Sequence, residues 1–409
     1  MTVTDNYQMD LHQIAGQLTF QDGICFPVKP VFANDTIFFL GSLSSKIRLG
    51  IKEKKLATEF SYFSLWARER NLRQLAEPWK SSNTRRRVGR GLSFHIAPSN
   101  VPSNTLFSLA FGLLSGNSVA LRIPSRVHSN HPFLLFILKE ELTKHPEVNE
   151  LVSLHAYSRT NYQITEYLSA RSQSRVIWGG DDTVQQVRSF KTPPSALDLS
   201  FPDRTSIAVV SLETLENLSD RNIQVAVSAL AKDIQVFDQN ACSSPRAIFI
   251  IADHENEALN SNLFQFFKLL DQSSQSIPTG HFSRAQAHIS SASQLALTSQ
   301  LDIIYAGKFC LAFKLVSSRC CHSIVKTARN GLLPVVITSD LSLVKDLIPS
   351  NVQTCVVLGE NLEIQKSLNE LTSQFPINRI VRPGMALSMD LFWDGHDIIG
   401  SLSRVVSCV

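Results

Sequence analysis

The sequence predicts an α/β protein of two domains, in which parallel sheets are covered by helices. The chain of 409 residues is long enough for two cores, and 44% of it is hydrophobic against 18% charged. Strand and helix patterns alternate between Gly91 and Ser211, and they alternate again after Asp220. Such alternation implies parallel strands joined by helical crossovers, which leave both faces of a sheet covered.

The first domain, expected over residues 1–215, has the pattern of a Rossmann-like fold. Strands are predicted at 92–96, 119–123, 150–156, 175–178 and 205–210, and helices at 106–114, 132–145 and 162–170. The most apolar stretch, 105–123, contains Gly112, a Ser-Gly-Asn turn and Arg122, which argues against a membrane-spanning helix. We therefore expect no stable membrane insertion.

The second domain is expected over residues 216–390, followed by a C-terminal segment at 391–409. Helices are predicted at 223–234, 257–270, 341–347 and 362–375, and strands at 247–252, 333–337 and 354–358. The serine- and glutamine-rich stretches 272–279 and 291–299 are interpreted as surface loops. The domain boundary is placed between Leu212 and Asp220.

Charge and cysteine content limit the class of protein. A net charge of +4 over this length argues against nucleic-acid binding. Seven cysteines without a CxxC pair, two of them adjacent at Cys320 and Cys321, indicate neither a disulfide framework nor a metal site. The segment from Met1 to Gly16 lacks the basic start and apolar core of a signal peptide. We expect a cytoplasmic protein.

Cys242 is the candidate for a catalytic nucleophile. It follows Asp-Gln-Asn-Ala and precedes Ser-Ser-Pro, on a predicted helix-to-strand loop. A nucleophilic cysteine must reach its thiolate form in a polar, partly open site, and the neighbouring Gln239, Asn240 and Ser243 supply polarity. The alternative is a buried structural cysteine, which is common. From local spacing the two interpretations are about equally favoured.

Two weaker motifs concern a cofactor. Gly179 and Gly180 stand between a predicted strand and helix, where backbone amides could approach a pyrophosphate, although a simple tight turn is the favoured alternative. Arg122 and Arg126 follow the second strand, where an acidic residue would favour NAD and arginine accommodates the 2′-phosphate of NADPH. Without the other motifs, a solvated strand end is the preferred explanation of these arginines.

Five runs match one family in order and spacing. They are 95–102, 112–118, 176–182, 237–245, and 393–397 with 401–404. The chain resembles the LuxC-like fatty acyl-CoA reductases of the aldehyde dehydrogenase superfamily, from about Arg90 to the C-terminus. The resemblance implies an aldehyde dehydrogenase-like fold, with a Rossmann-like cofactor domain, a second α/β catalytic domain and a C-terminal segment that returns towards the active site.

The resemblance also implies roles for individual residues. Cys242 corresponds to the nucleophile that accepts the acyl group, and Asn100 to the side-chain donor that stabilises the oxyanion. The residues expected to contact the cofactor are Pro98, Ser99, Arg122, Ser125, Arg126, Gly179 and Gly180. No metal is expected.

The function implied is NADPH-dependent reduction of an acyl-CoA or acyl-carrier thioester to the aldehyde, through an acyl-enzyme on Cys242. Hydrolytic relatives use a glutamate that activates water, and the corresponding stretch 202–207 contains none. A cysteine-dependent acyltransferase or thioesterase without redox chemistry, and a non-catalytic scaffold, are the alternatives. An acyl-transferring partner enzyme and a homo-oligomer are further expectations.

Three other features have both a functional and a structural interpretation. His396 stands where the family usually has tyrosine, so His396 and Asp394 could move a proton or only shape the site, with packing favoured. His95, inside a strand, is expected to be structural. The basic stretch 85–90 could contact phosphates but is more typical of a solvated surface.

Overall fold

The computed structural model describes residues 13–20, 25–79, 85–252, 256–277, 281–298, 301–315, 324–359 and 362–407. Cys320, Cys321 and most of the segment Met1 to Gly16 lie outside these ranges. The chain forms two compact units, the first comprising Met1–Pro202 with Met389–Val409 and the second Asp203–Ser388. Each is described by itself below.

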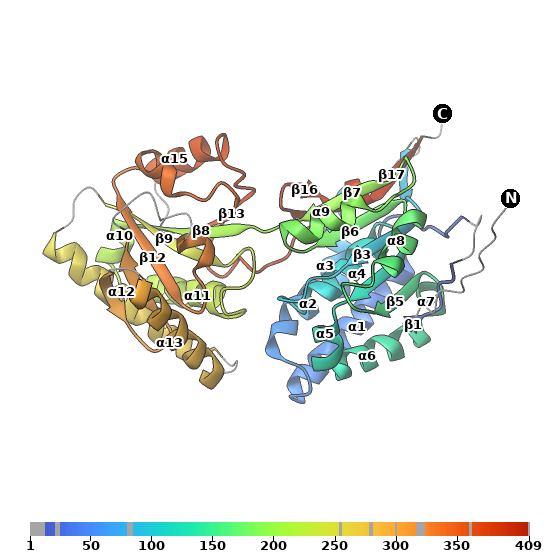
Figure 1. Cartoon of the computed structure of the whole chain (residues 1–409), viewed down its shortest axis with the longest axis horizontal. Helices are drawn as coiled ribbons and strands as arrows, with labels where there is room; N and C mark the ends of the chain where they lie inside the picture. The colour runs from blue at the N-terminus through green and yellow to red at the C-terminus, as the bar shows by residue number, and fades with distance from the viewer. Residues whose placement is uncertain are drawn as a thin grey trace. The chain divides into compact units, whose positions relative to one another are not determined.

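The first unit contains a six-stranded sheet in the order β1-β5-β4-β3-β6-β7 (Figure 1). Its strands are β1 (Gln13–Gly16), β3 (Leu92–Ile96), β4 (Ser118–Ile123), β5 (Val152–Ala156), β6 (Ser174–Trp178) and β7 (Leu197–Phe201). All neighbours are parallel except β1, which pairs antiparallel with β5. The carboxyl ends of five strands therefore lie at one edge, where ligands bind in folds of this type.

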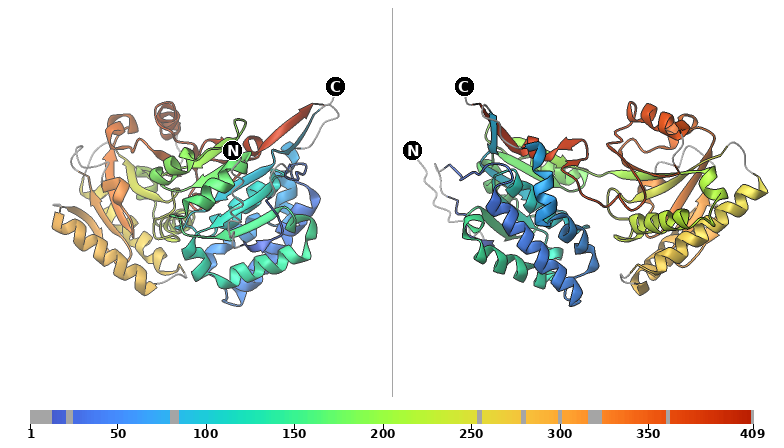
Figure 2. Two further views of the ribbon diagram at one scale, coloured as in Figure 1. Left: turned by 45° about the vertical axis from the view of Figure 1, so that its right-hand side comes forward. Right: turned by 180° about the vertical axis from the view of Figure 1, so that it is seen from behind.

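Helices cover both faces of this sheet. Helices α8 (Tyr162–Arg171) and α9 (Asp181–Ser189) bury Ile164, Leu168, Val184 and Val187 against β3, β4 and β6. The opposite side carries α4 (Asn104–Leu114), α6 (Pro132–Lys144) and α1 (Asn34–Lys52), and α1 and α6 pack side by side (Figure 2). Shorter helices complete the unit: α2 (Ser61–Trp66), α3 (Glu69–Leu75), α5 (Ser125–Asn130) and α7 (Pro146–Asn149).

The second unit contains a seven-stranded sheet in the order β10-β11-β12-β9-β8-β13-β14. Its strands are β8 (Thr205–Ser211), β9 (Pro245–Ile251), β10 (Asp302–Ala306), β11 (Leu311–Lys314), β12 (Leu332–Thr338), β13 (Val352–Leu358) and β14 (Arg379–Val381). Only the pairing of β10 with β11 is antiparallel among the strands described in this sheet. The amino ends of β8, β9 and β13 therefore share one edge.

Alternating residues of these strands form two cores. Ala208, Val210, Ile248 and Ile250 face α11 (Arg221–Gln235) and α12 (Glu257–Gln275), while Ile207, Val209, Ala247 and Phe249 face the 3-10 helix η3 (Leu341–Leu347) and α15 (Leu362–Thr372). The short α10 (Leu212–Glu216) and the longer α13 (His281–Thr298) also belong to this unit. Within the described residues, no helix is both long and apolar enough to cross a membrane.

The division between the units comes earlier along the chain than the boundary expected at residues 215 and 216. The strand β8 was assigned to the first domain, but it is a central strand of the second sheet, paired with β9 and β13. All seven of its residues are buried. The first unit's strand β7 ends at Phe201, directly before Pro202, and proline lacks the N–H that would continue a strand ladder.

Two interpretations of the second unit are wrong. The stretch 291–299, expected as a surface loop, belongs to α13 through Thr298, and residues 272–275 belong to α12. Serine and glutamine are compatible with a helix when apolar residues such as Ala292 and Leu295 pack on a core. The segment at 341–347 is helical as expected but of the tighter 3-10 type.

The C-terminal segment folds onto the first unit. β15 (Phe392–Trp393) and β16 (His396–Asp397) form a hairpin, α16 (Ile398–Leu402) follows, and β17 (Ser403–Ser407) pairs antiparallel with β2 (Arg85–Gly89). The basic stretch 85–90 is thus a strand with one following residue. Arg87 donates to the Ser403 hydroxyl at 3.0 Å, and Arg90 to the Ser401 carbonyl at 2.8 Å, so both have structural contacts.

Candidate active site

The loop that carries Cys242 joins the end of α11 to the start of β9 in the second unit, as the sequence predicts. Helix α11 begins where the Asp220 carboxylate accepts hydrogen bonds from the N–H groups of Asn222 and Ile223, at 2.6 and 3.3 Å. After its last turn the chain reverses through Asp238 and Gln239, which have left-handed φ angles of 51° and 62°. Cys242 is thereby placed at the amino edge of the sheet.

The Gln239 side chain is fully buried and holds this loop in place. Its Nε2 donates to the carbonyl oxygens of Pro245 and Leu332, at 3.0 and 3.1 Å, and its Oε1 accepts from the N–H of Gly331 at 2.9 Å. A buried amide with all these partners fixes the conformation of the segments it joins. The Cys242 loop is therefore tied to the starts of β9 and β12.

Cys242 itself is half-buried, and the Ser206 hydroxyl donates to its carbonyl oxygen at 2.7 Å. Cys310 and Cys355 are fully buried, and burial raises the pKa of both thiols, that of Cys355 to about 12. Such thiols stay protonated at neutral pH and do not react. Of the cysteines in the described ranges, Cys242 and the exposed Cys25 are the ones that solvent reaches.

Asn100 lies in the first unit, on the loop that links β3 to α4. Its side chain and that of Ser99 are exposed, and Pro98 is half-buried. The loop leaves the carboxyl edge of the sheet, where a Rossmann-like domain presents its ligand-binding groups. Asn100 and Cys242 belong to different units, so their joint role at an oxyanion stays a prediction.

A pocket of about 280 Å³ opens at this carboxyl edge of the first sheet. It lies between the ends of β3 and β4 and the helices α8 and α9. Its lining residues are Ile96, Arg122, Arg159, Thr160, Tyr162, Thr165, Asp182, Thr183, Gln186, Val187 and Phe190. Guanidinium and hydroxyl groups beside aromatic rings form a surface that suits a nucleotide phosphate and its base.

Arg122 is held rigidly in this pocket. Its Nε and Nη2 both donate to the Tyr157 carbonyl at 3.3 Å, and its guanidinium lies 5.2 Å from the centroid of the Tyr157 ring. Burial lowers the pKa of Arg122, Tyr157 opposes that shift, and the neighbouring positive charge of Arg159 adds to it. Two arginines therefore concentrate positive charge at one end of the pocket, where an anionic group would relieve their repulsion.

Of the residues predicted to bind a cofactor, Arg122 alone is among the described residues that line this pocket. Ser125 and Arg126 are exposed in the first turn of α5, and Gly179 and Gly180 form the turn between β6 and α9. A Cβ on Gly179 would lie 3.0 Å from the Cβ of Thr183, so glycine has a packing reason there. A cofactor role for these residues stays a prediction.

Sequence reasoning missed Arg159, Thr160 and Thr183. Arg159 and Thr160 follow the predicted strand at 150–156, whose carboxyl end lies at the same edge as that of the strand before Arg122. The polar residues at that strand end are a signal that the sequence contains. The order of the strands, which brings the two strand ends together, cannot be predicted from the sequence.

His95 is structural, in agreement with the expectation. It is fully buried in β3, with Nε2 hydrogen-bonded to the Ser93 hydroxyl and Nδ1 to the Ser108 hydroxyl, each at 2.8 Å. Burial lowers its pKa to about 3, so the ring is neutral at physiological pH. The network continues through Ser174 and Trp178, which donate to Ser93 and Ser108 at 2.8 and 3.2 Å.

Asp394 and His396 form part of the C-terminal hairpin. Asp394 and Gly395 have φ angles of 52° and 78° in the two-residue turn between β15 and β16, a conformation that favours Asp-Gly. The His396 ring packs edge-on against Phe201, with centroids 5.7 Å apart, and Phe201 stacks on Trp178 at 3.9 Å. These contacts are those of packing residues.

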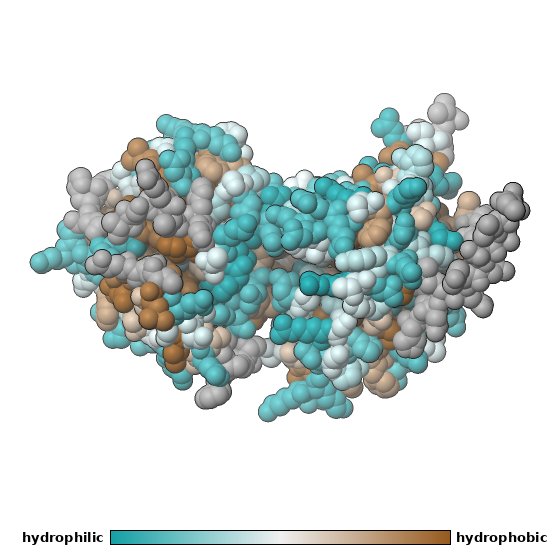
Figure 3. All heavy atoms as spheres, viewed as in Figure 1, coloured by the Kyte–Doolittle hydropathy of each residue, from teal (hydrophilic) through white to brown (hydrophobic). Residues whose placement is uncertain are grey.

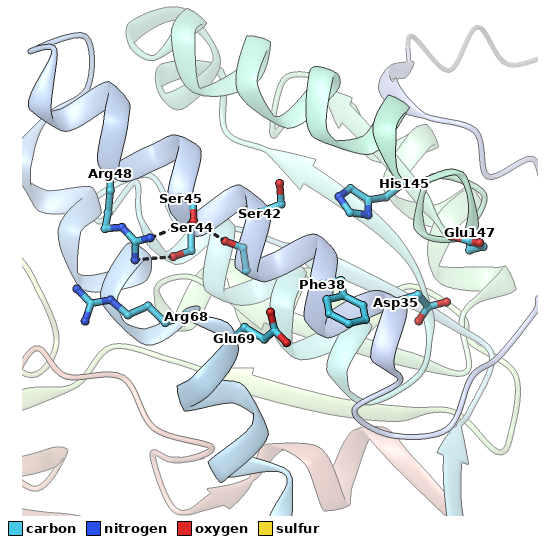
Figure 4. Close-up of a pocket in the computed structure, with 11 residues that line it drawn as sticks. Asp35, Phe38, Ser42, Ser44, Ser45, Arg48, Arg68, Glu69, His145 and Glu147 are labelled. Carbon is cyan, nitrogen blue, oxygen red and sulfur yellow. Dashed lines mark hydrogen bonds between the residues drawn. The ribbon is translucent and has the colours of Figure 1, made fainter.

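A larger pocket of about 930 Å³, also in the first unit, shares no residue with the predicted site. It is formed by α1, the start of α3 and the segment around His145 (Figure 4). Two of its charged side chains have these partners: Arg48 donates to the hydroxyls of Ser44 and Ser45, at 3.4 and 3.0 Å, and Glu69 pairs with Arg73 at 2.9 Å. The result is a groove of mixed charge.

The family assignment comes from a family model. The model for acyl-CoA reductase (LuxC) matches residues 68–407, which include the Cys242 loop, Asn100 and the pocket around Arg122. The chain belongs to the LuxC family. The resemblance inferred from the motifs is therefore confirmed.

Curated relatives agree with membership of the LuxC family. Long-chain acyl-protein thioester reductase of Vibrio harveyi is 27% identical over 195 residues, 46% of this chain and 38% of the relative. The protein of the same name from Aliivibrio fischeri is 22% identical over 191 residues, 47% of this chain and 37% of the relative. The matched part of the chain thus spans well under half of either relative.

Solved structures show the fold expected for a LuxC-family chain. An aldehyde dehydrogenase from Bartonella henselae superimposes with a TM-score of 0.63 at 10% identity, covering 91% of this chain and 86% of the other. An NAD-dependent benzaldehyde dehydrogenase from Corynebacterium glutamicum gives 0.61 at 14% identity, covering 91% and 84%. The aldehyde dehydrogenase-like fold is confirmed.

Proposed function

We propose that this LuxC-family protein reduces an acyl thioester to an aldehyde, with a reduced nicotinamide dinucleotide, through an acyl-enzyme on Cys242. The observation that carries the proposal is the family match over residues 68–407, because it spans both the solvent-reached Cys242 and the arginine-lined pocket. The curated relatives carry the name acyl-protein thioester reductase.

The chemistry assigned to Cys242 has two steps. Its thiolate attacks the carbonyl carbon of the donor thioester, and collapse of the oxyanion expels the donor thiolate, leaving the acyl group on the Cys242 sulfur. A bound reduced nicotinamide would supply the hydride, so that the second oxyanion expels the Cys242 thiolate and releases the aldehyde. In both steps an N–H donor to the oxyanion is needed, the role proposed for Asn100.

Two basic side chains in the first-unit pocket support a nucleotide that carries an additional phosphate, although the lining also includes Asp182. Arg122 and Arg159 place two guanidinium groups at one end, with the Thr160 hydroxyl beside them. No acidic side chain follows β4, where one would bind the free ribose hydroxyls of NADH. We therefore propose NADPH as the reductant, with its 2′-phosphate bound by Arg122 and Arg159.

The acyl donor is proposed to be acyl-CoA or an acyl group on a carrier or partner protein. The second option follows the name of the curated relatives, and a partner enzyme that transfers acyl groups would provide it.

A homo-oligomer is also proposed. Exposed apolar residues, among them Phe264 and Ile303, lie on α12 and on the edge strand β10, where apolar surface is visible (Figure 3), and edge strands pair readily with other chains.

The test separates reduction from acyl transfer. The protein is incubated with an acyl-CoA series without reductant, and the peptide containing Cys242 is examined by mass spectrometry for an acyl adduct. NADPH is then added, and its absorbance and the aldehyde are followed, with Cys242→Ser as the control. An adduct that NADPH removes with stoichiometric aldehyde supports the proposal. Acyl-CoA cleavage with constant NADPH absorbance would establish the acyltransferase or thioesterase alternative, and no adduct would reject both.

A further inference from the structure

Arg246 occupies an irregular position immediately after the Cys242 loop. In the pairing of β8 with β9, Ser206 lies opposite Pro245 and the next residue, Ile207, lies opposite Ala247, so Arg246 is the extra residue of a β-bulge. Bulges redirect a side chain away from the regular alternation and are frequent beside active sites. The same Ser206 that precedes this bulge binds the carbonyl of Cys242.

The Arg246 side chain is buried, and none of the ion pairs found among the described residues joins it to a carboxylate. Only 6% of it is exposed, its Nη1 donates to the Lys326 carbonyl at 3.2 Å, and its Nε has no hydrogen-bond partner among the described residues. A buried cation of this kind is costly unless a negative charge lies near. A negative charge close to the guanidinium would therefore stabilise this arrangement.

Three ionisable groups act on the guanidinium of Arg246. Burial, together with the positive charge of Arg329, lowers the pKa of Arg246 to about 9, although the charges of Cys242 and Asp203 act in the opposite direction. Arg329 also donates to the Lys326 carbonyl, at 2.9 Å, and Asp203 is exposed. The described titratable groups that act on Arg246 are thus a second cation, one solvated carboxylate and the Cys242 sulfur.

We propose that Arg246 is a positioning residue that stabilises Cys242 as a thiolate from the buried side of its loop. The inference rests on the proposed function, since it assigns the nucleophile to Cys242. In this role the guanidinium acts through the Cys242 sulfur and not by contact with the acyl group. It favours the charged nucleophile before attack and a good leaving thiolate when the aldehyde is released.

The experiment measures the thiol directly. The rate of alkylation of Cys242 by iodoacetamide is followed by peptide mass spectrometry from pH 5.5 to 10, in the wild type, Arg246→Met and Arg246→Lys. Cys25, an exposed thiol in the first unit, is the internal control. Arg329→Met is the matched variant, because it removes the second, half-buried arginine.

The wild-type Cys242 midpoint is expected below the ordinary value of about 8.5. Arg246→Met should raise it by about one pH unit, Arg246→Lys by less than half of that, and Arg329→Met by less than Arg246→Met. The Cys25 profile should not change in any variant. A purely structural role for Arg246 would alter stability but not the midpoint.

Three results would overturn the assignment. They are a wild-type midpoint at or above about 8.5, an unchanged midpoint in a folded Arg246→Met protein, and a larger shift in Arg329→Met. The first needs no variant and applies even if Arg246→Met does not fold. A low midpoint with no acylation by acyl-CoA would instead count against the proposed function and leave the role of Arg246 standing.

Discussion

The Gln239 Oε1 accepts a hydrogen bond from the N–H of Gly331 at 2.9 Å, across 92 positions of the sequence. Gly331 has a φ of 83°, and a Cβ there would lie 1.9 Å from the Phe309 carbonyl oxygen. The contact thus joins the loop before β9 to a backbone position that only glycine can occupy. It fixes the Cys242 loop relative to the starts of β9 and β12.

Gln239→Leu should lower the free energy of unfolding by about 3 kcal/mol, because it leaves two carbonyls and one N–H buried without partners. Acylation of Cys242 should fall as well, since the loop loses its support. Denaturation followed by circular dichroism measures the first effect and adduct formation the second. Asn240→Ala, at the exposed next residue, is the control, and an equal loss in both variants would contradict the role of Gln239.

The buried, neutral His95 should make the first unit less stable in acid. Its folded pKa of about 3 lies below the ordinary value of about 6.5, so the unfolded chain takes up a proton that the folded chain resists. Stability is therefore present above pH 6.5 and is lost as the pH falls towards 3. We expect a loss of about 2 kcal/mol between pH 6.5 and 4.5 that is absent in His95→Gln.

The four tryptophans make the measurement selective. Trp66, Trp79, Trp178 and Trp393 all lie in the first unit, so their fluorescence reports its unfolding in urea. Gln can still hydrogen-bond to Ser93 and Ser108, which limits other effects of the substitution. Parallel pH profiles for wild type and variant would show that His95 is not the group responsible.

Asp233 should give the stability of the second unit the opposite dependence on pH. Its carboxylate, buried on α11, accepts from the Gly384 N–H at 2.6 Å, and burial raises its pKa to about 7. A raised folded pKa means that stability is present below the unfolded value of about 4 and is lost as the pH rises through 7. The wild type should therefore lose about 2 kcal/mol relative to Asp233→Asn between pH 5 and 7, measured by circular dichroism.

Arg159→Ala should raise the KM for NADPH about tenfold with little change for NADH, because a charge-assisted hydrogen bond to the 2′-phosphate contributes about 1.5–3 kcal/mol. Arg126→Ala is the matched control, since Arg126 is exposed and does not line the pocket. Equal effects of Arg159→Ala on both reductants would place Arg159 outside the phosphate site. A larger effect of Arg126→Ala would restore the assignment made from sequence.

The amino-acid sequence by itself determined the features that depend on neighbours along the chain. The strand at 92–96, the helix at 162–170 and the helix-to-strand loop of Cys242 all follow from local periodicity and turn residues, and β3, α8 and the loop before β9 agree with them. The motifs around Asn100 and Cys242 were sufficient for the family. A loop residue between two predictable elements can be located without knowledge of the fold.

Tertiary structure decided what depends on pairing between distant segments. β8 has the same local pattern as the strands before it, and only its hydrogen bonds to β9 and β13 place it in the second sheet. Arg159 reaches Arg122 because β5 lies beside β4, and Arg246 leaves the regular alternation because of a bulge against β8. Strand order and register are set by the burial of whole faces, which no local stretch of sequence contains.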